Sequence, residues 1–174
     1  MTTWNIDAAH SEVTFKIRHL MVSSVRGKFN KLSGSVTTSA DDFAEAKVSM
    51  EIDASSVDTN NEQRDGHLKS ADFFQVTSFP TITFSSTSFA KKGDGYELKG
   101  NMMLHGVTKP VVFSVAMNGI NKGMDGARVA GFEAHTKISR KDFGLTWNAA
   151  LEAGGVALSD EVSIELLIEL KETK

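Results

Sequence analysis

Residues 11–29 read SEVTFKIRHLMVSSVRGKF, and the first half of this stretch decides the fold class. Val13, Phe15 and Ile17 alternate with polar or charged residues. A period of two places these three apolar side chains on one face of an extended strand, and that face must be covered by other parts of the chain. The stretch therefore predicts a half-buried β-strand.

The second half of the stretch has a different spacing. Leu20, Met21, Val22 and Val25 recur three and four residues apart, which is the helical period, before Gly27 interrupts the pattern. We therefore expect a short apolar helix that caps the end of the first strand. Beyond it, a long strand should bend sharply near residues 30–31, where the apolar parity changes.

Similar alternation recurs along the rest of the chain, so that about eight strands are expected in all. The clearest are 46–52, 80–84, 96–104, 111–117, 130–138 and 162–170. A tight turn at 93–95 and the lack of a segment long enough for a crossover helix favour an antiparallel sheet. Residues 62–68 form the other expected short helix. The fold class is thus all-β, a single antiparallel eight-stranded barrel with short helices capping its ends.

Composition excludes several classes of protein. The chain has 174 residues, a formal charge of −3 and no cysteine, so we expect one domain spanning residues 1–174, without disulfides or thiolate metal sites and with no nucleic-acid partner. No stretch approaches the roughly 20 apolar residues of a membrane span, and we expect no stable membrane insertion. No signal peptide is visible, so a cytoplasmic location is expected, although a mature periplasmic form would look the same.

A barrel of this size either fills its interior with side chains or encloses one small ligand. Gly34, Gly100, Ala130 and Ala134 occupy inward positions and could leave space. Several methionines could repack around an apolar guest. The same residues could equally mark bends and fill gaps, so periodicity alone leaves both readings open.

The chain resembles the YceI-like family of lipocalin-like proteins. The resemblance is carried by motifs that run from residue 4 to residue 144, and the last strand also fits. They are WxIDxxHSxVxFxIxH at 4–19, GxF at 27–29, RDxHLxSxDFF at 64–74, FPxIxF at 79–84, Gly100, LxGVTKPV at 104–111 and ISRKDFG at 138–144. The resemblance implies an extended lipocalin-like barrel with an apolar channel that binds polyisoprenoids or similar long molecules, and it implies a homodimer.

The predicted ligand is therefore a polyisoprenoid, an isoprenoid quinone or a fatty-acid derivative, held by a carrier or storage protein. The alternative is a structural or interaction protein with a filled barrel that dimerises through a strand edge. The expected ligand-binding residues face inward or close one end of the barrel. They are Val13, Phe15, Ile17, Leu20, Met21, Phe29, Val48, Met50, Ile52, Phe74, Ile82, Phe84, Met102, Leu104, Phe113, Val115 and Phe132.

Asp7, His10 and Ser11 are the residue types of a hydrolase triad. A triad needs a hydroxyl, an imidazole and a carboxylate aligned in space, which three residues of one tight turn rarely achieve. Asp and Ser in such turns more often bind the backbone of the turn. We expect a binding protein and not an enzyme.

Two further polar clusters have a structural and a functional interpretation. Arg64, Asp65 and His67 could bind a head group, but an ion pair that pins the short helix over the barrel is the favoured reading. Arg140 and Asp142 are expected to brace a strand end.

Metal and cofactor binding are not expected. The five histidines include no pair at i, i+4 with a nearby carboxylate, the arrangement that would indicate zinc.

Overall fold

A computed structural model describes residues 1–173. Its strands are β1 (Thr2–Ile6), β2 (Glu12–His19), β3 (Ser23–Phe29), β4 (Leu32–Thr38), β5 (Lys47–Asp53), β6 (Val57–Asp58), β7 (Thr81–Lys92), β8 (Gly95–Leu104), β9 (Val107–Lys122), β10 (Arg128–Ser139) and β11 (Leu158–Glu172). The α-helix is α1 (Glu62–Lys69), and three 3₁₀ turns are η1 (Ala8–His10), η2 (Ala54–Ser56) and η3 (Arg140–Phe143). No helix within residues 1–173 is long and apolar enough to span a membrane.

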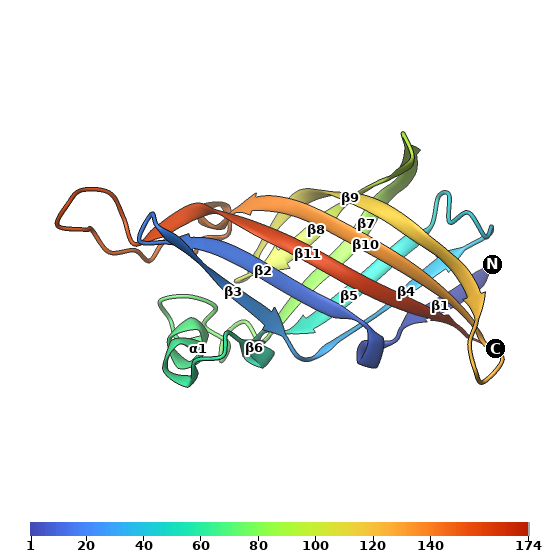
Figure 1. Ribbon diagram of the computed structural model, residues 1–174, viewed down its shortest axis with the longest axis horizontal. Coiled ribbons are helices and arrows are strands. Elements are labelled where there is room, and N and C mark those ends of the chain that lie inside the picture. Colours follow the sequence, from blue (N-terminus) through green and yellow to red (C-terminus); the bar gives the residue numbers. More distant parts are fainter. Residues whose placement is uncertain (174) are drawn as a thin grey trace.

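The strands form one closed antiparallel barrel. Hydrogen bonding runs β1-β4-β5-β7-β8-β9-β10-β11, and the pairing of β11 with β1 closes this ring of eight. The long β11 pairs at its C-terminal end with β1 and along its N-terminal half with β2. β2, β3 and β6 thereby lengthen the barrel at the end where α1 lies (Figure 1). The predicted eight-stranded lipocalin-like barrel is confirmed.

The decisive stretch folds as a hairpin, and the helix expected over residues 20–25 is wrong. β2 pairs directly with β3, with Val13 opposite Phe29 and Ile17 opposite Val25. A strand partner satisfies the backbone groups of the whole segment, whereas two turns of isolated helix are too short to be stable by themselves. The apolar spacing that suggested a helix arises because the turn residues Leu20–Val22 interrupt the alternation of two strands.

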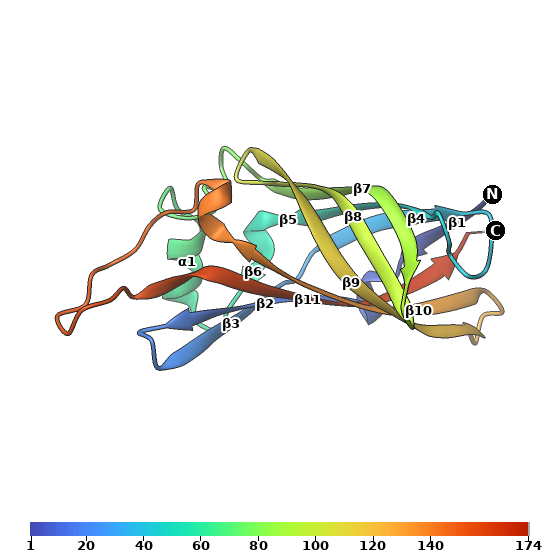
Figure 2. The same cartoon turned by 90° about the horizontal axis from the view of Figure 1, so that it is seen from above.

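The expected bend near residues 30–31 separates β3 from β4. β3 pairs with β2 and β6, while β4 pairs with β1 and β5, so the chain changes neighbours at this point. The lysine amide at position 31 donates to the Ser56 hydroxyl at 3.0 Å, which fixes the bend against η2. The bend lets one continuous segment serve both halves of the elongated barrel (Figures 1 and 2).

Two of the small inward residues do not leave space. A Cβ at Gly100 would overlap the ring of Phe84 and lie 2.5 Å from the carbonyl oxygen of Ser85. A Cβ at Gly34 would overlap the carbonyl of Ser49. Neighbouring groups therefore already occupy the room that these glycines provide, and they do not account for an internal cavity.

Candidate functional site

The barrel encloses a cavity of about 390 Å³, which lies within the range of small-molecule sites. Its wall is almost entirely apolar and is built from alternate residues of nearly every strand. The structure places most of the predicted residues on this wall. They are Val13, Phe15, Ile17, Phe29, Val48, Met50, Ile52, Phe74, Ile82, Phe84, Met102, Leu104, Phe113, Val115 and Phe132.

Leu20 and Met21 lie outside the wall. Both occupy the β2–β3 turn, where their side chains are exposed. Their predicted place at the cavity depended on the helix that does not form. In a hairpin the turn projects beyond the last strand pair, so its side chains leave the interior.

Several wall residues were not among the predicted set. The whole inner face of β11 lines the cavity. Its apolar residues alternate with polar ones in the sequence, so this face could have been predicted. These residues are Val162, Ile164, Leu166, Ile168 and Leu170. Leu145 and Trp147 also line the cavity, but they come from an irregular segment in which no periodicity could reveal them.

One end of the cavity is sealed by aromatic rings. Trp4 and Phe43 are fully buried with ring centroids 5.2 Å apart, and Phe43 meets Phe132 at 5.0 Å. The Arg128 guanidinium covers the Trp4 ring at 5.3 Å. These contacts close the end that carries β1 and both chain termini (Figure 1).

The other end is more open. Along β11, Leu170 and Leu166 are buried, with a partly exposed Ile168 between them. The next three wall residues are all partly exposed, namely Ile164, Val162 and Leu158. This gradient in exposure places the mouth of the cavity at the end where α1, the β2–β3 hairpin and the loop 144–157 gather (Figures 1 and 2).

α1 is fixed beside the mouth through Thr59. The Arg64 guanidinium donates to the Thr59 hydroxyl at 2.8 Å and to its carbonyl at 2.7 Å. The Asp65 carboxylate accepts from the Thr59 amide at 2.9 Å and from its hydroxyl at 2.6 Å. Arg64 and Asp65 thus pin the helix separately through one threonine. The ion pair expected among Arg64, Asp65 and His67 does not form within residues 1–173, and His67 pairs with Asp72 instead.

An aromatic cluster lies between α1 and the loop. The His67 ring meets Trp147 at 4.8 Å and Phe73 at 5.0 Å, both edge to face. His67 Nε2 is 2.9 Å from the Asp72 carboxylate, which fixes the ring orientation. Because His67, Phe73 and Trp147 all line the cavity, this cluster forms part of its mouth.

Arg140 braces the loop 144–157 and the start of β11, whereas the expectation was a strand-end brace made with Asp142. Its side chain is only 3% exposed, and it donates to the carbonyls of Leu145 (2.7 Å), Trp147 (2.8 Å) and Ser159 (2.9 Å). Burial lowers the pKa of this guanidinium, partly offset by the charge of Asp160. Its Nη2 has no hydrogen-bond partner among residues 1–173, and the residue lines the cavity. Asp142, the other residue expected in the brace, is exposed in η3.

Asp7, His10 and Ser11 do not form a triad. The His10 Nδ1 lies 3.0 Å from Asp7 Oδ2, but the Ser11 hydroxyl is engaged with the backbone of Glu169, accepting from its amide at 3.0 Å. Asp7 also accepts from the Ala9 amide at 3.0 Å and so caps η1. The serine is thus held by β11 and not by the imidazole.

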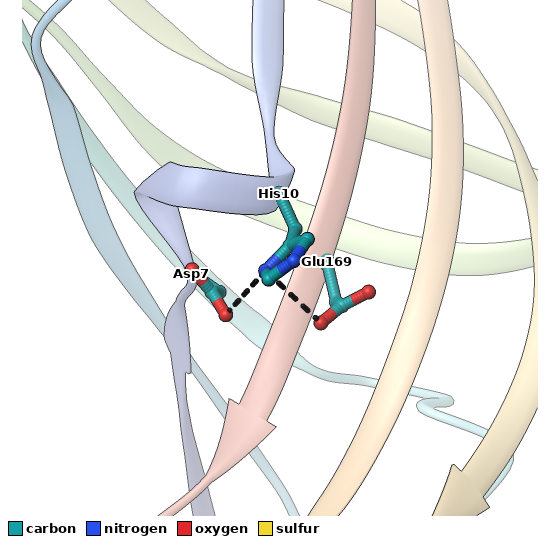
Figure 3. A group of neighbouring side chains, drawn as sticks. All are labelled: Asp7, His10 and Glu169. Carbon is teal, nitrogen blue, oxygen red and sulfur yellow. Dashed lines mark hydrogen bonds and ion pairs between the residues drawn. The ribbon is translucent and has the colours of Figure 1, made fainter. Parts of the chain in front are cut away.

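Glu169 joins this group from the other end of the chain (Figure 3), a proximity that sequence spacing could not reveal. His10 Nδ1 is 3.8 Å from Glu169 Oε1, and the imidazole is largely exposed. The hydrogen bond to Asp7, with the charges of Asp7 and Glu169, raises the pKa of His10. The hydrogen bond to His10 lowers the pKa of Asp7 despite some desolvation. Asp7, His10 and Glu169 offer ligand atoms within 4.8 Å of one another, but capping and ion pairing already account for their arrangement.

Comparison with known proteins identifies the family. The family profile described as the YceI-like domain matches residues 4–170. The chain belongs to the YceI-like family. It is 39% identical over 170 residues to UPF0312 protein SA2479 of Staphylococcus aureus (strain N315), with 97% of each chain covered.

Solved structures agree with this assignment. The YCEI protein of Campylobacter jejuni is 32% identical with a TM-score of 0.77, and the match covers 97% of this chain and 96% of that one. A polyisoprenoid binding domain from Saccharophagus degradans has a TM-score of 0.74 over 98% of each chain. At 16% identity, this second similarity shows a shared fold.

Proposed function

We propose that this YceI-like protein binds one long-chain apolar molecule inside its barrel, as a carrier or storage protein. The ligand classes proposed are polyisoprenoids, isoprenoid quinones and fatty-acid derivatives. The observation that carries the proposal is the apolar cavity, closed at one end by Trp4 and Phe43 and more open at the other. The name of one structural neighbour, a polyisoprenoid binding domain, supports the same ligand class.

The chemistry of the wall suits such a ligand. A prenyl or acyl chain has no polar groups along its length, so its affinity comes from apolar surface removed from water. One five-carbon isoprene unit contributes at most roughly 3 to 4 kcal/mol, and losses of chain and overall freedom offset a large part of the sum. A few buried units suffice for micromolar binding, without any specific contact to a head group.

Arg140 supplies a polar contact for the ligand near the mouth. Its Nη2 has no partner among residues 1–173, and the guanidinium lies at the cavity. A carbonyl or anionic oxygen at the end of the chain would accept a hydrogen bond from it and offset the cost of its burial. This contact favours ligands that end in an acceptor oxygen over plain hydrocarbons.

The alternative, a filled barrel that dimerises through a strand edge, is less well supported. An internal cavity of about 390 Å³ leaves the barrel unfilled. In addition, closure through β1 and β11 leaves few unpaired strand edges in the ring. Homodimer formation stays a prediction.

Native mass spectrometry of the protein purified without detergent tests the proposal directly. We expect a discrete added mass that disappears on denaturation and matches one molecule in an organic extract. Protein stripped of lipid should bind a long-chain prenyl alcohol and change the fluorescence of Trp147, which lines the cavity. Trp147→Phe should remove this change, because Trp4 is fully buried at the sealed end. An empty protein that also fails to bind prenyl and acyl probes would contradict the proposal.

A further inference from the structure

The tip of the β2–β3 hairpin exposes three consecutive apolar side chains. Leu20, Met21 and Val22 are 42%, 56% and 82% exposed. Single exposed apolar residues are ordinary on protein surfaces, but a contiguous group at a projecting tip marks an interaction site more often. Val156 of the adjacent loop is also exposed.

The conformation of the turn does not explain these residue types. Leu20 and Met21 both have positive φ, 53° and 62°. Two central residues with positive φ mark the turn that favours Asn-Gly, and bulky apolar residues are strained there. The turn is nevertheless well held, because the Val22 amide donates to the carbonyl of His19 at 3.2 Å and Arg18 donates to that of Met21 at 3.1 Å. The Leu20 amide also donates to the carbonyl of Ala157 at 2.8 Å, and Met21 lies beside Gly155 of the loop. This partial packing still leaves Met21 56% and Val22 82% exposed, and turn preference does not account for apolar residues there.

The outer face of the same hairpin is basic. Residues 12–29 contain four cations, Lys16, Arg18, Arg26 and Lys28, and one acid, Glu12. The segment therefore has a formal charge of +3, whereas the whole chain has −3. Lys16 lies directly opposite Arg26, and like charges in this position destabilise a strand pair. None of the four cations is in an ion pair within residues 1–173. Asp58 and Glu165 are the acids that share the surface hollow beside them.

The hairpin stands at the mouth of the cavity. Its inner face contributes Ile17, His19 and Val25 to the wall. Its tip projects at the same end as α1 and the loop 144–157, away from the sealed end with the chain termini (Figures 1 and 2). A surface that covered the tip would therefore lie next to the mouth.

We infer that this hairpin docks the protein on an anionic lipid bilayer. The apolar tip enters the boundary between head groups and acyl chains, and the basic outer face lies against anionic head groups. This orientation brings the mouth to the bilayer, so that an apolar ligand can pass between membrane and cavity without crossing water. The docking itself goes beyond the proposed function, and only its purpose, ligand transfer, rests on that function.

Co-sedimentation with lipid vesicles tests the inference. The vesicles are phosphatidylcholine alone and phosphatidylcholine with phosphatidylglycerol. One variant, Leu20→Asn with Met21→Gly, removes the apolar tip while installing the residues that the turn prefers, so it should fold at least as well. A second, Lys16→Glu with Arg26→Glu, reverses the basic face. Matched controls at the opposite end of the barrel are Met124→Asp and Lys122→Glu, because Met124 is fully exposed in the β9–β10 loop and Lys122 is exposed at the end of β9.

We expect the protein to sediment with the phosphatidylglycerol vesicles and much less with phosphatidylcholine alone, and salt should weaken its binding. Each unit of positive charge removed should weaken binding about fivefold, so the double reversal, which changes four units, should remove most of the binding. Loss of the apolar tip should also weaken binding, whereas the controls should bind as the parent protein does. Equal losses in the controls, or no binding by the parent protein, would overturn the inference. It would also be overturned if sedimentation velocity showed a dimer that the tip variant dissolves, because a second copy would then cover the hairpin.

A separate measurement keeps this result distinct from the proposed function. A prenyl alcohol delivered from ethanol, without vesicles, should bind the parent protein and both hairpin variants equally, because the replaced residues lie outside the wall. Failure of the parent protein to bind this probe contradicts the proposed function and leaves the vesicle result standing. Failure at the vesicles alone contradicts the docking.

Discussion

The Arg140 Nη1 donates to the carbonyl of Leu145 at 2.7 Å and thereby holds the start of the long loop against the barrel. The same atom reaches the carbonyl of Trp147 at 2.8 Å, and Nε reaches that of Ser159. One buried side chain thus fixes both ends of an irregular segment that sequence patterns could not place. The position of Trp147 at the mouth of the cavity depends on this brace.

Arg140→Lys should destabilise the protein by about 3 kcal/mol, because a lysine cannot reproduce the fork of donors and leaves buried carbonyls unpaired. Urea unfolding followed by circular dichroism measures this loss. Lys141→Met is the matched control: its exposed pair with Asp160, at 3.3 Å, should contribute less than about 0.5 kcal/mol. Equal stability of both variants would contradict the role of Arg140 as a brace.

The contrast between strands and loop shows what the sequence can reveal. The inner faces of β2, β5 and β9 could be predicted, because apolar and polar residues alternate strictly along these strands and every second side chain points inward. The β2–β3 turn could not be recognised, because Leu20 and Met21 adopt positive φ without the glycine or asparagine that usually signals it. Contacts such as His10 with Glu169 depend on barrel closure, which brings together residues far apart in the chain.

Gly100→Ala should destabilise the protein by about 1–3 kcal/mol, because the added methyl group has no room beside Phe84 and the Ser85 carbonyl. Gly66→Ala should instead keep or slightly raise the stability of the protein. Gly66 lies in α1 with open space around the new methyl group, and alanine favours a helix over glycine by up to about 1 kcal/mol. Thermal or urea unfolding of both variants measures the change in the free energy of unfolding. An equal loss of stability in Gly66→Ala and Gly100→Ala would contradict the tight packing around Gly100.

The His10 pKa, measured by NMR titration, should lie above its ordinary value of 6.5. Asp7→Asn should bring it down toward that value, because an asparagine can still cap η1 but carries no charge. The folded-state pKa of His10 is raised, so its stabilising effect is full below about pH 6.5 and is lost as pH rises through the folded pKa. The folded-state pKa of Asp7 is lowered from 3.8, so the stabilising effect of Asp7 is full above about pH 3.8 and is lost as pH falls through its folded pKa. The Asp7–His10 pair therefore stabilises the fold most between about pH 3.8 and pH 6.5, the ordinary pKa values of the two groups. A His10 pKa at its ordinary value in the parent protein would contradict the contact.

Ala134→Phe should reduce lipid binding by about tenfold or more, equivalent to ~1.4 kcal/mol, because the ring would occupy cavity space beside Val115. The unliganded protein should keep most of its stability, since the ring fills space that is otherwise empty. Ala116→Phe is the matched control, because Ala116 lies on the neighbouring strand β9 with its side chain on the outer face. Native mass spectrometry and fluorescence titration with a prenyl alcohol compare the two. If both variants bound the probe as tightly as the parent protein, the ligand would not occupy this part of the barrel, and the inner wall would be core alone.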